Sequence, residues 1–263
     1  MVLEKIIEAS NKGAEVLRKY FGQCFKLYKK SIALDFRTRA DLESEKKIIK
    51  DLSKNFPDYN ILSEEVGFID HKSKFTFVID PLDGTSNFVM GMPNFCASIA
   101  LLEEKKIIAG VVNNPILNQI YCARRGKGAY LNNKRIKVNS QKNISNINLA
   151  YDCDYGHYFE KRLRDLIKNL EKKNIKRFLI NMSPALDLCR LAEGKIECFI
   201  NNGNEIYDYA AGKLIVKEAG GIVTDFFGNK EADERNRFFL ASNGMAIHKK
   251  VVEISSKILT LGR

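Results

Sequence analysis

Residues 80–88 read Asp80-Pro81-Leu82-Asp83-Gly84-Thr85-Ser86-Asn87-Phe88. This nonapeptide follows the run 75–79, Phe-Thr-Phe-Val-Ile, whose β-branched and aromatic side chains predict a buried strand. The strand would deliver two carboxylates to its carboxyl end, where Pro81 is expected to end regular pairing. Gly84 permits a sharp turn, and Thr85 or Ser86 is expected to cap a following helix. Paired acids beside free backbone N–H groups suit cations on one side and a phosphate on the other.

Length and composition are those of a soluble globular protein. The chain has 263 residues, of which 45% are hydrophobic and 29% charged, so it is long enough for one large core or for two halves that share a layer. No apolar stretch approaches the roughly 20 residues of a membrane span. The first residues form an acid-containing amphipathic pattern, which is not typical of a signal peptide. We therefore expect a cytoplasmic protein without a membrane partner.

The net charge of +11 raises the possibility of nucleic-acid binding. However, the lysines are scattered through helical stretches and turns and are not gathered with aromatic residues, which favours a solvated surface. The sequence therefore predicts no nucleic-acid partner. A positive field would still help to attract an anionic phosphorylated substrate.

The six cysteines show no metal-binding spacing, which argues against zinc. Five of them lie in apolar or strand-like contexts, Cys24 being the exception, and are expected to be reduced and buried. A disulfide remains an alternative, and the sequence does not indicate which residues would pair.

The hydrophobic pattern divides the chain into two halves, 1–144 and 145–263. The first half begins with helices at 2–21 and 41–55. It continues with the meander pattern of an antiparallel sheet, and its strands are expected at 95–102, 107–113, 119–123 and 129–131. The second half alternates strands and helices in the manner of an α/β layer. Its elements are expected at 147–152, 158–173, 176–180, 184–193, 196–200, 208–219, 221–226 and 238–242.

Three further places offer carboxylates to the first motif. Asp41 opens the second predicted helix, Glu64 and Glu65 follow a short strand at 60–63, and Asp208 begins a later helix. Each also has a purely structural interpretation. Asp41 and Asp208 would serve as helix caps, and the two glutamates would lie in an exposed turn.

Taken together, these segments resemble the inositol monophosphatase family of magnesium-dependent sugar phosphatases, over nearly the whole chain. Residues 80–88 match the family's Asp-Pro-(Ile/Leu)-Asp-Gly-Thr-x-Asn-Phe signature, which is highly specific. Residues 207–212 resemble its second signature, with tyrosine in place of the usual tryptophan. Residues 63–65 match Gly-Glu-Glu except at the first position, and 38–41 match Thr-x-x-Asp. The resemblance implies a mixed α+β and α/β fold, a five-layer αβαβα sandwich.

The resemblance also implies roles for individual residues. The expected metal ligands, for two to three Mg²⁺ per site with Mn²⁺ as a possible substitute, are Glu64, Asp80, the carbonyl of Leu82, Asp83 and Asp208. The expected catalytic residues are Asp41, Thr85 and Glu64: Thr85 and Asp41 would orient and deprotonate the attacking water, and Glu64 would hold a weaker third metal together with water. The expected substrate-binding residues are Asp83, Gly84, Thr85, Ser183, Pro184, Asn201, Gly203 and Asp208. A homodimer is expected because relatives form one. Oxygen ligands alone favour Mg²⁺ or Mn²⁺ over zinc.

Two departures from the family pattern concern the sugar pocket. The family usually has Gly-(Ser/Thr)-Ala-Ala where this chain has residues 182–185, Met-Ser-Pro-Ala, and Pro184 lacks an N–H for a substrate hydroxyl. Inositol-specific members place a glutamate where this chain has Asn201. We therefore expect a phosphatase of small sugar or cyclitol phosphates that hydrolyses inositol 1-phosphate and fructose 1,6-bisphosphate with kcat/KM values within about two orders of magnitude of each other. The alternatives are a 3′-phosphoadenosine 5′-phosphate phosphatase and a non-catalytic phosphosugar- or RNA-binding relative.

Overall fold

The first layer consists of two helices, α1 (Val2–Tyr20) and α2 (Arg39–Asn55). The computed structural model describes residues 2–23, 28–29, 36–154 and 161–258. Both helices present apolar side chains, such as Ile6, Leu17 and Ile48, to the neighbouring sheet, where these are fully buried. The helices predicted at 2–21 and 41–55 are confirmed.

The second layer is an eight-stranded sheet with the strand order β10-β9-β8-β7-β6-β5-β3-β4. Its strands are β3 (Asn60–Ser63), β4 (Gly67–Ile69), β5 (Phe75–Asp83), β6 (Cys96–Glu103), β7 (Lys106–Asn114), β8 (Gln119–Arg124), β9 (Ala129–Leu131) and β10 (Lys134–Ile136). From β5 to β10 each strand pairs antiparallel with the next, so the predicted meander is confirmed. β3 runs parallel to β5, so the carboxyl ends of both strands lie at one edge. A separate two-stranded ribbon pairs β1 (Tyr28–Lys29) with β2 (Phe36–Arg37).

The third layer is a pair of helices, α5 (Pro184–Ala192) and α6 (Ile206–Glu218), which lies between the two sheets. Close packing explains the small residues of α6. A Cβ added to Gly110 of β7 would lie 2.9 Å from the Cα of Ala211, so Gly110 leaves no room for a side chain between β7 and α6. α6 is therefore fixed against the first sheet, and its amino end, with Asp208, is held close to the ends of β3 and β5.

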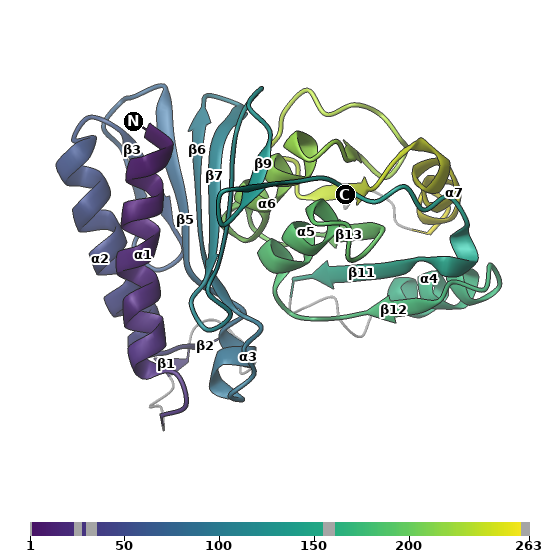
Figure 1. Ribbon diagram of the computed structural model, residues 1–263, viewed down its shortest axis with the longest axis horizontal. Coiled ribbons are helices and arrows are strands. Elements are labelled where there is room, and N and C mark those ends of the chain that lie inside the picture. Colours follow the sequence, from purple (N-terminus) through teal and green to yellow (C-terminus); the bar gives the residue numbers. More distant parts are fainter. Residues whose placement is uncertain (1, 24–27, 30–35, 155–160, 259–263) are drawn as a thin grey trace.

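The fourth layer is a five-stranded sheet with the order β12-β11-β13-β15-β14. Its strands are β11 (Asn148–Cys153), β12 (Arg177–Leu179), β13 (Cys198–Asn202), β14 (Ile222–Thr224) and β15 (Phe238–Ser242). The fifth layer, α4 (Lys161–Glu171) and α7 (Met245–Ser255), covers its far face. Figure 1 shows the five layers side by side, so the expected αβαβα sandwich is confirmed. Residues 158–160 of the predicted helix 158–173 lie outside the described part of the chain.

The remaining elements are short. They are the helix α3 (Thr85–Val89) and the 3₁₀ turn η1 (Ile144–Asn146). In the sequence, the eight-stranded sheet lies before residue 144 and the five-stranded sheet lies after it. α5 and α6 follow residue 145 in sequence, yet α6 packs on the first sheet through β6, β7 and β8. The division into halves 1–144 and 145–263 stays a prediction.

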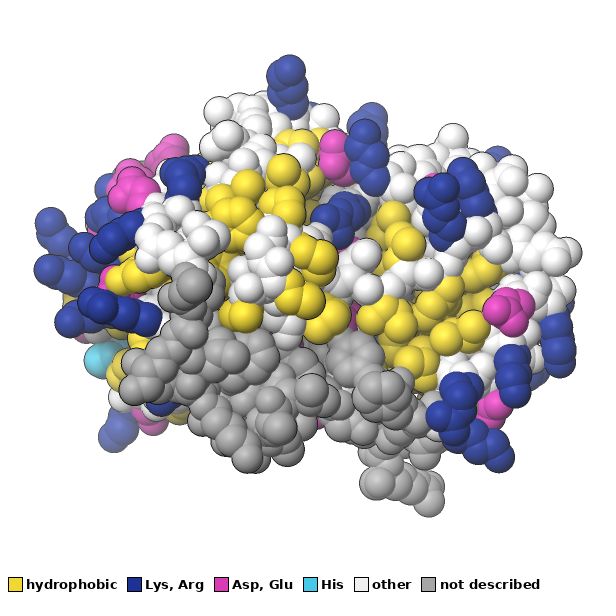
Figure 2. Space-filling model, turned by 90° about the horizontal axis from the view of Figure 1, so that it is seen from below, with side chains coloured by type: hydrophobic (Ala, Val, Ile, Leu, Met, Phe, Trp, Pro, Cys, Tyr) yellow, Lys and Arg dark blue, Asp and Glu magenta, His cyan; other side chains and the backbone are white. Residues whose placement is uncertain are grey.

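Three expectations about the surface and the cysteines can be compared with the structure. Figure 2 shows Lys and Arg side chains dispersed around the visible face and not gathered in one patch. Within the described ranges, no helix has the length and apolarity needed to cross a membrane. Five of the cysteines are free and buried, as predicted: Cys96, Cys122, Cys153, Cys189 and Cys198. Cys24 lies outside the described residues.

Candidate active site

A β-bulge turns both aspartates of the first motif to the same face of the sheet. Asp80 pairs with Ser98 and Asp83 with Cys96, so three steps along β5 oppose two steps along β6. In a regular strand, residues three apart face opposite sides, and one extra residue reverses this. The expectation that pairing ends at Pro81 is corrected, because β5 resumes its pairing at Asp83. Pro81 lacks an N–H and is tolerated at the irregularity.

The turn after the bulge is made by Gly84, whose φ of 86° lies in the left-handed region. A Cβ at this position would lie 2.8 Å from the backbone oxygen of Asn94, so only glycine fits. Gly84 is also the N-cap residue of α3, and no side chain caps this helix. The predicted capping role of Thr85 or Ser86 is therefore wrong. Thr85 Oγ1 instead lies 3.0 Å from the carbonyl oxygen of Leu82 and 3.3 Å from Asp41 Oδ1.

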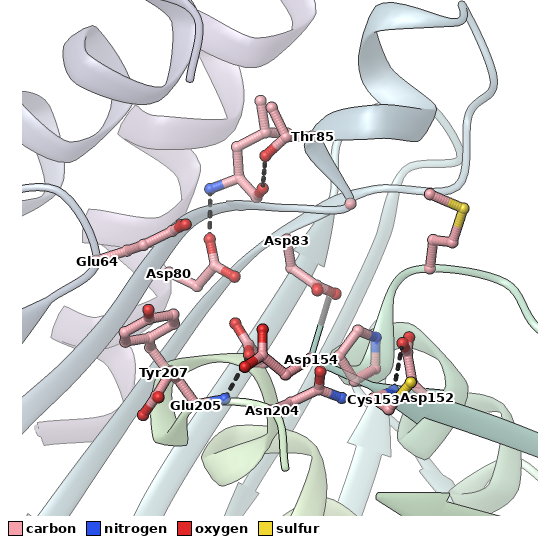
Figure 3. A pocket seen from close by; sticks show the side chains of 15 residues that line it. Glu64, Asp80, Asp83, Thr85, Asp152, Cys153, Asp154, Asn204, Glu205 and Tyr207 are labelled. Atoms are coloured by element: carbon pink, nitrogen blue, oxygen red, sulfur yellow. Dashed lines mark hydrogen bonds between the residues drawn. The ribbon is translucent and has the colours of Figure 1, made fainter. Parts of the chain in front are cut away.

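The motif opens into a cavity of about 380 Å³. Its lining residues are Glu64, Asp80, Leu82, Asp83, Gly84, Thr85, Asp152, Cys153, Asp154, Met182, Pro184, Asn204, Glu205, Tyr207 and Asp208. In Figure 3, Glu64, Asp80 and Asp83 lie on the side of the first sheet, and Asp152, Asp154 and Glu205 lie on the side of the second. The fold thus brings together the predicted Glu64, Leu82, Gly84, Thr85, Pro184 and the three predicted metal-binding aspartates.

Two predicted residues, Asp41 and Ser183, do not line the cavity but contact residues that do, Thr85 and Asp83. Asp41 is fully buried, and its Oδ2 accepts hydrogen bonds from the backbone N–H (2.7 Å) and the hydroxyl (2.6 Å) of Thr38. This is a capping box at the start of α2, so the structural interpretation of Asp41 holds as well. Ser183 Oγ donates to Asp83 Oδ2 at 2.6 Å, and the N–H of Ala185 donates to the same oxygen at 3.2 Å. Asp83 is therefore fixed from the first turn of α5.

Two other predicted substrate contacts, Asn201 and Gly203, do not reach the cavity wall. The amide nitrogen of Asn201 donates to the carbonyl of Arg237 at 2.7 Å, and its oxygen accepts from Asn204 at 2.9 Å. The carbonyl of Gly203 accepts from Arg237 Nε at 2.8 Å. The loop after β13 instead presents Asn204 and Glu205 to the cavity.

Burial and mutual repulsion raise the pKa values of the cavity aspartates. Removal from water raises the pKa of Asp83 to about 8, although the Ser183 hydroxyl opposes the shift. The pKa values of Asp80 and Asp208 are raised by burial and then by the charge of Glu64. Burial raises the pKa of Asp41 to about 7, against the hydrogen bonds from Thr38. Cations in the cavity would remove this repulsion and keep the carboxylates ionised.

The donor set suits a hard divalent cation. The cavity offers carboxylate oxygens and the carbonyl of Leu82. Among the described residues that line it there is no histidine, and the one cysteine, Cys153, is almost fully buried. In the described part of the chain, no three His, Cys, Asp or Glu side chains converge into a ready-made coordination sphere. The residues fit Mg²⁺ by their chemistry, because a bound cation would favour the ionised form of carboxyl groups whose pKa values burial has raised.

Sequence reasoning missed several cavity residues, of which Asp152, Asp154 and Met182 are the most informative. A signal for the first two was present, since the strand predicted at 147–152 ends in carboxylates just as the strand before Glu64 does. Met182 has a φ of 55°, a left-handed conformation that is uncommon for a residue with a side chain. The family's usual glycine at this position indicated that requirement.

Comparisons with known proteins agree with the site and the fold. The model of the inositol monophosphatase family matches residues 2–260. A Thermotoga maritima fructose-1,6-bisphosphatase/inositol-1-monophosphatase is 36% identical over 98% of this chain and 96% of its own. The Nus factor SuhB of Haemophilus influenzae is 35% identical over 98% of this chain and 95% of its own. A solved structure of the extragenic suppressor protein suhB from Bartonella henselae superimposes with a TM-score of 0.90 at 33% identity, covering 97% of this chain and 98% of that one. The chain belongs to the inositol monophosphatase family.

Proposed function

We propose that this protein is a Mg²⁺-dependent phosphatase of small sugar and cyclitol phosphates, with inositol 1-phosphate and fructose 1,6-bisphosphate as candidate substrates. The observation that carries the proposal is the bulge in β5, which turns Asp80 and Asp83 into one cavity with Glu64 and Asp208. Membership of the inositol monophosphatase family supports hydrolysis of sugar phosphates.

In this proposal the metal is held by Glu64, Asp80, the carbonyl of Leu82, Asp83 and Asp208. When bound, Mg²⁺ would lower the pKa of the attacking water and stabilise the negative charge on the departing oxygen. Mn²⁺ has the same preference for oxygen ligands and is expected to substitute.

The neighbouring residues of the chain handle the proton and the phosphate. The hydroxyl of Thr85 lies between Asp41 and the carbonyl of Leu82, so Asp41 is placed to accept a proton through it. A raised pKa near 7 suits a general base at neutral pH. The backbone N–H groups of Gly84 and Thr85 are the proposed donors to the phosphate.

The test of the proposal is phosphate release from inositol 1-phosphate, fructose 1,6-bisphosphate and 3′-phosphoadenosine 5′-phosphate, with Mg²⁺ or with EDTA. Asp83→Asn removes a charge at a strand end and no apolar packing, so we expect it to lower kcat/KM by about 10³-fold or more with the fold retained. Asp58→Asn, at an exposed position outside the cavity, is the matched control and should keep wild-type activity. Full turnover in EDTA, or in Asp83→Asn, would contradict the metal-dependent proposal.

Two alternatives are resolved by the same experiment. A preference for 3′-phosphoadenosine 5′-phosphate would identify a nucleotide phosphatase. A non-catalytic binding role is favoured by the relatives named Nus factor SuhB, and it predicts no release from any ester. The intact set of cavity carboxylates supports the enzyme. A homodimer and a cytoplasmic location remain predictions.

A further inference from the structure

Met182 has an unusual backbone conformation for a residue of the cavity lining. Among the described residues that line the cavity, it is the only one other than glycine with a positive φ, 55°. A Cβ is disfavoured in this left-handed region, and the conformation persists where the surrounding structure enforces it. The contacts on either side of Met182 identify the groups that enforce it.

The carbonyl of the preceding residue, Asn181, is held by two side-chain amides from the first half of the chain. Asn87 Nδ2 and Asn94 Nδ2 each lie 2.8 Å from this oxygen. Asn87 is buried, and its Nδ2 also lies 2.8 Å from the carbonyl oxygen of Asn94 and 3.3 Å from that of Met182. Since Asn87 lies on α3 and Asn94 precedes β6, these bonds tie the segment before α5 to the first motif.

A buried ion pair on α5 sets the direction in which these amides point. Arg190 Nη1 lies 2.8 Å from Oδ1 of the fully buried Asp187. A guanidinium only donates, so Arg190 contacts the amide oxygen of Asn94 and leaves the amide nitrogen to the Asn181 carbonyl. A carboxylate only accepts, so Asp187 takes the amide nitrogen of Asn181, at 2.9 Å and 3.1 Å. We call this network the amide latch, with the members Asn87, Asn94, Asn181, Asp187 and Arg190.

The residues on the other side of Met182 belong to the proposed active site. Ser183 Oγ donates to Asp83 Oδ2 at 2.6 Å. A Cβ on Gly84 would lie 3.3 Å from the carbonyl oxygen of Met182 and 2.8 Å from that of Asn94. The backbone held by the latch therefore packs directly against the turn whose N–H groups are the proposed phosphate donors. A change in the conformation of Met182 would displace both this support and the Ser183 hydroxyl.

We propose that the amide latch consists of positioning residues, which hold Met182 in its left-handed conformation and thereby fix Asp83 and the Gly84 turn for catalysis. The inference rests on the proposed phosphatase function and adds to it residues that do not line the cavity. Glycine at position 182 would adopt the same conformation without support, because it has no Cβ. The effect of breaking the latch should therefore depend on the residue at this position.

The experiment measures kcat/KM in latch variants, using the preferred ester of the three named above at fixed free Mg²⁺. Asn94→Ala, at a half-buried position, removes a donor to the Asn181 carbonyl together with the contact with Arg190. Asn87→Ala removes the second donor. Each should lower kcat/KM by about tenfold or more, because small misplacements of reacting groups have large effects on rate. Asn169→Ala, on α4, removes an amide donor to a carbonyl at the same distance of 2.8 Å and should keep wild-type activity.

The variant Met182→Gly distinguishes positioning from a general loss of stability. When Met182→Gly is already present, adding Asn94→Ala should lower kcat/KM by less than about threefold, whereas a purely structural role gives the same loss in both backgrounds.

A second readout does not depend on turnover. Because Ser183 orients the proposed metal ligand Asp83, Asn94→Ala should raise the Mg²⁺ concentration that gives half of the rise in melting temperature by about threefold or more. Asn169→Ala should leave that concentration unchanged.

The outcomes separate this inference from the function on which it rests. A wild-type phosphatase whose latch variants behave like Asn169→Ala would overturn the inference alone, and so would an equal effect of Asn94→Ala with and without Met182→Gly. Because Asn94 is half-buried, Asn94→Ala decides the matter where Asn87→Ala does not fold. If no ester is hydrolysed, the proposed function fails and the Mg²⁺ titration decides the inference. A wild-type protein with neither turnover nor a response to Mg²⁺ would overturn both.

Discussion

Thr85 is the residue at which a structural and a catalytic role can be told apart. Its hydroxyl contacts Leu82 and Asp41, and α3 has Gly84 as its N-cap, so the hydroxyl caps no helix. We expect Thr85→Ala to lower kcat by about 10²-fold or more with a smaller change in KM, because the hydroxyl is most valuable in the transition state. Steady-state kinetics and the melting temperature measure the two effects. The adjacent Ser86→Ala is the matched control. A lower melting temperature with unchanged kcat would contradict the catalytic role.

The sequence predicted which residues lie near the site more reliably than it predicted where their side chains point. Glu64, Asp80, Asp83 and Asp208 were found because carboxylates at strand and helix ends are recognisable in a sequence. Asn201 was misplaced, because its position one residue before the end of β13 does not reveal that its amide turns to the carbonyl of Arg237. That hydrogen bond joins residues 36 positions apart, a distance over which no local pattern carries information.

Elements were predicted well where their pattern is regular and less well where it is interrupted. The meander β6 to β9 alternates and turns in a typical way, and it was found. The bulge in β5 was not, since Pro81 suggested an end where the strand continues for two more residues. Pairing with β6 resumes beyond Pro81 at Asp83, and that partner strand cannot be identified from the nonapeptide itself.

Helix α6 contains a buried ion pair that holds the loop beside the active site. Lys213 is fully buried, and its Nζ lies 3.0 Å from Glu231 Oε1, 3.1 Å from the carbonyl of Glu234 and 2.9 Å from that of Asn236. The same nitrogen lies 3.8 Å from the ring centroid of Phe239. Because α6 carries Asp208, the ion pair connects the helix of a cavity residue to the loop that continues to Arg237.

We expect Lys213→Met to lower the free energy of unfolding by about 3–5 kcal/mol, because it leaves Glu231 buried with only the more distant Lys217. Urea denaturation measures the change. Lys249→Met, at an exposed lysine of α7, is the control and should change it by less than about 0.5 kcal/mol. The double variant Lys213→Met/Glu231→Leu should recover much of the loss, since no unpaired charge remains. A single-variant loss below about 1 kcal/mol would show that the pair is dispensable.

At the scale of the whole molecule, the alternation of helices and strands was sufficient to predict the layers. This alternation did not predict that α6 packs on the first sheet. The apolar residues of α6 are distributed evenly around the helix because it is buried on both sides, and such a pattern does not indicate which element lies against it. The alternation also did not predict that Asp152 and Asp154 face the metal carboxylates. That juxtaposition arises only when the two sheets are brought together across α5 and α6.

The repulsion among the cavity carboxylates predicts how the stability of the whole molecule depends on pH. The folded-state pKa values of Asp41, about 7, and Asp83, about 8, lie above their ordinary values, and those of Asp80 and Asp208 are raised as well. Between about pH 6.5 and 8 the unfolded carboxyls are ionised while the folded ones retain protons, so the free energy of unfolding must fall as the pH rises. Two other shifted groups act mostly outside this window: His248, with a lowered pKa of about 4, acts below its ordinary 6.5, and Lys213, with a lowered pKa of about 8, acts mostly above pH 8.

Mg²⁺ should remove this pH dependence, and this is the measurement that connects the proposed site to the fold. In EDTA we expect the free energy of unfolding to drop by about 1–3 kcal/mol from pH 6.5 to 8. Because the metal competes with protons for the same carboxylates, Mg²⁺ should stabilise the protein more at pH 8 than at pH 6.5. Asp83→Asn should flatten the curve in EDTA and weaken the response to Mg²⁺, whereas Asp58→Asn should change neither. If the free energy of unfolding in EDTA stays level or rises from pH 6.5 to 8, the carboxylates are already ionised and compensated without a cation. The argument for a metal site from their mutual repulsion would then fail.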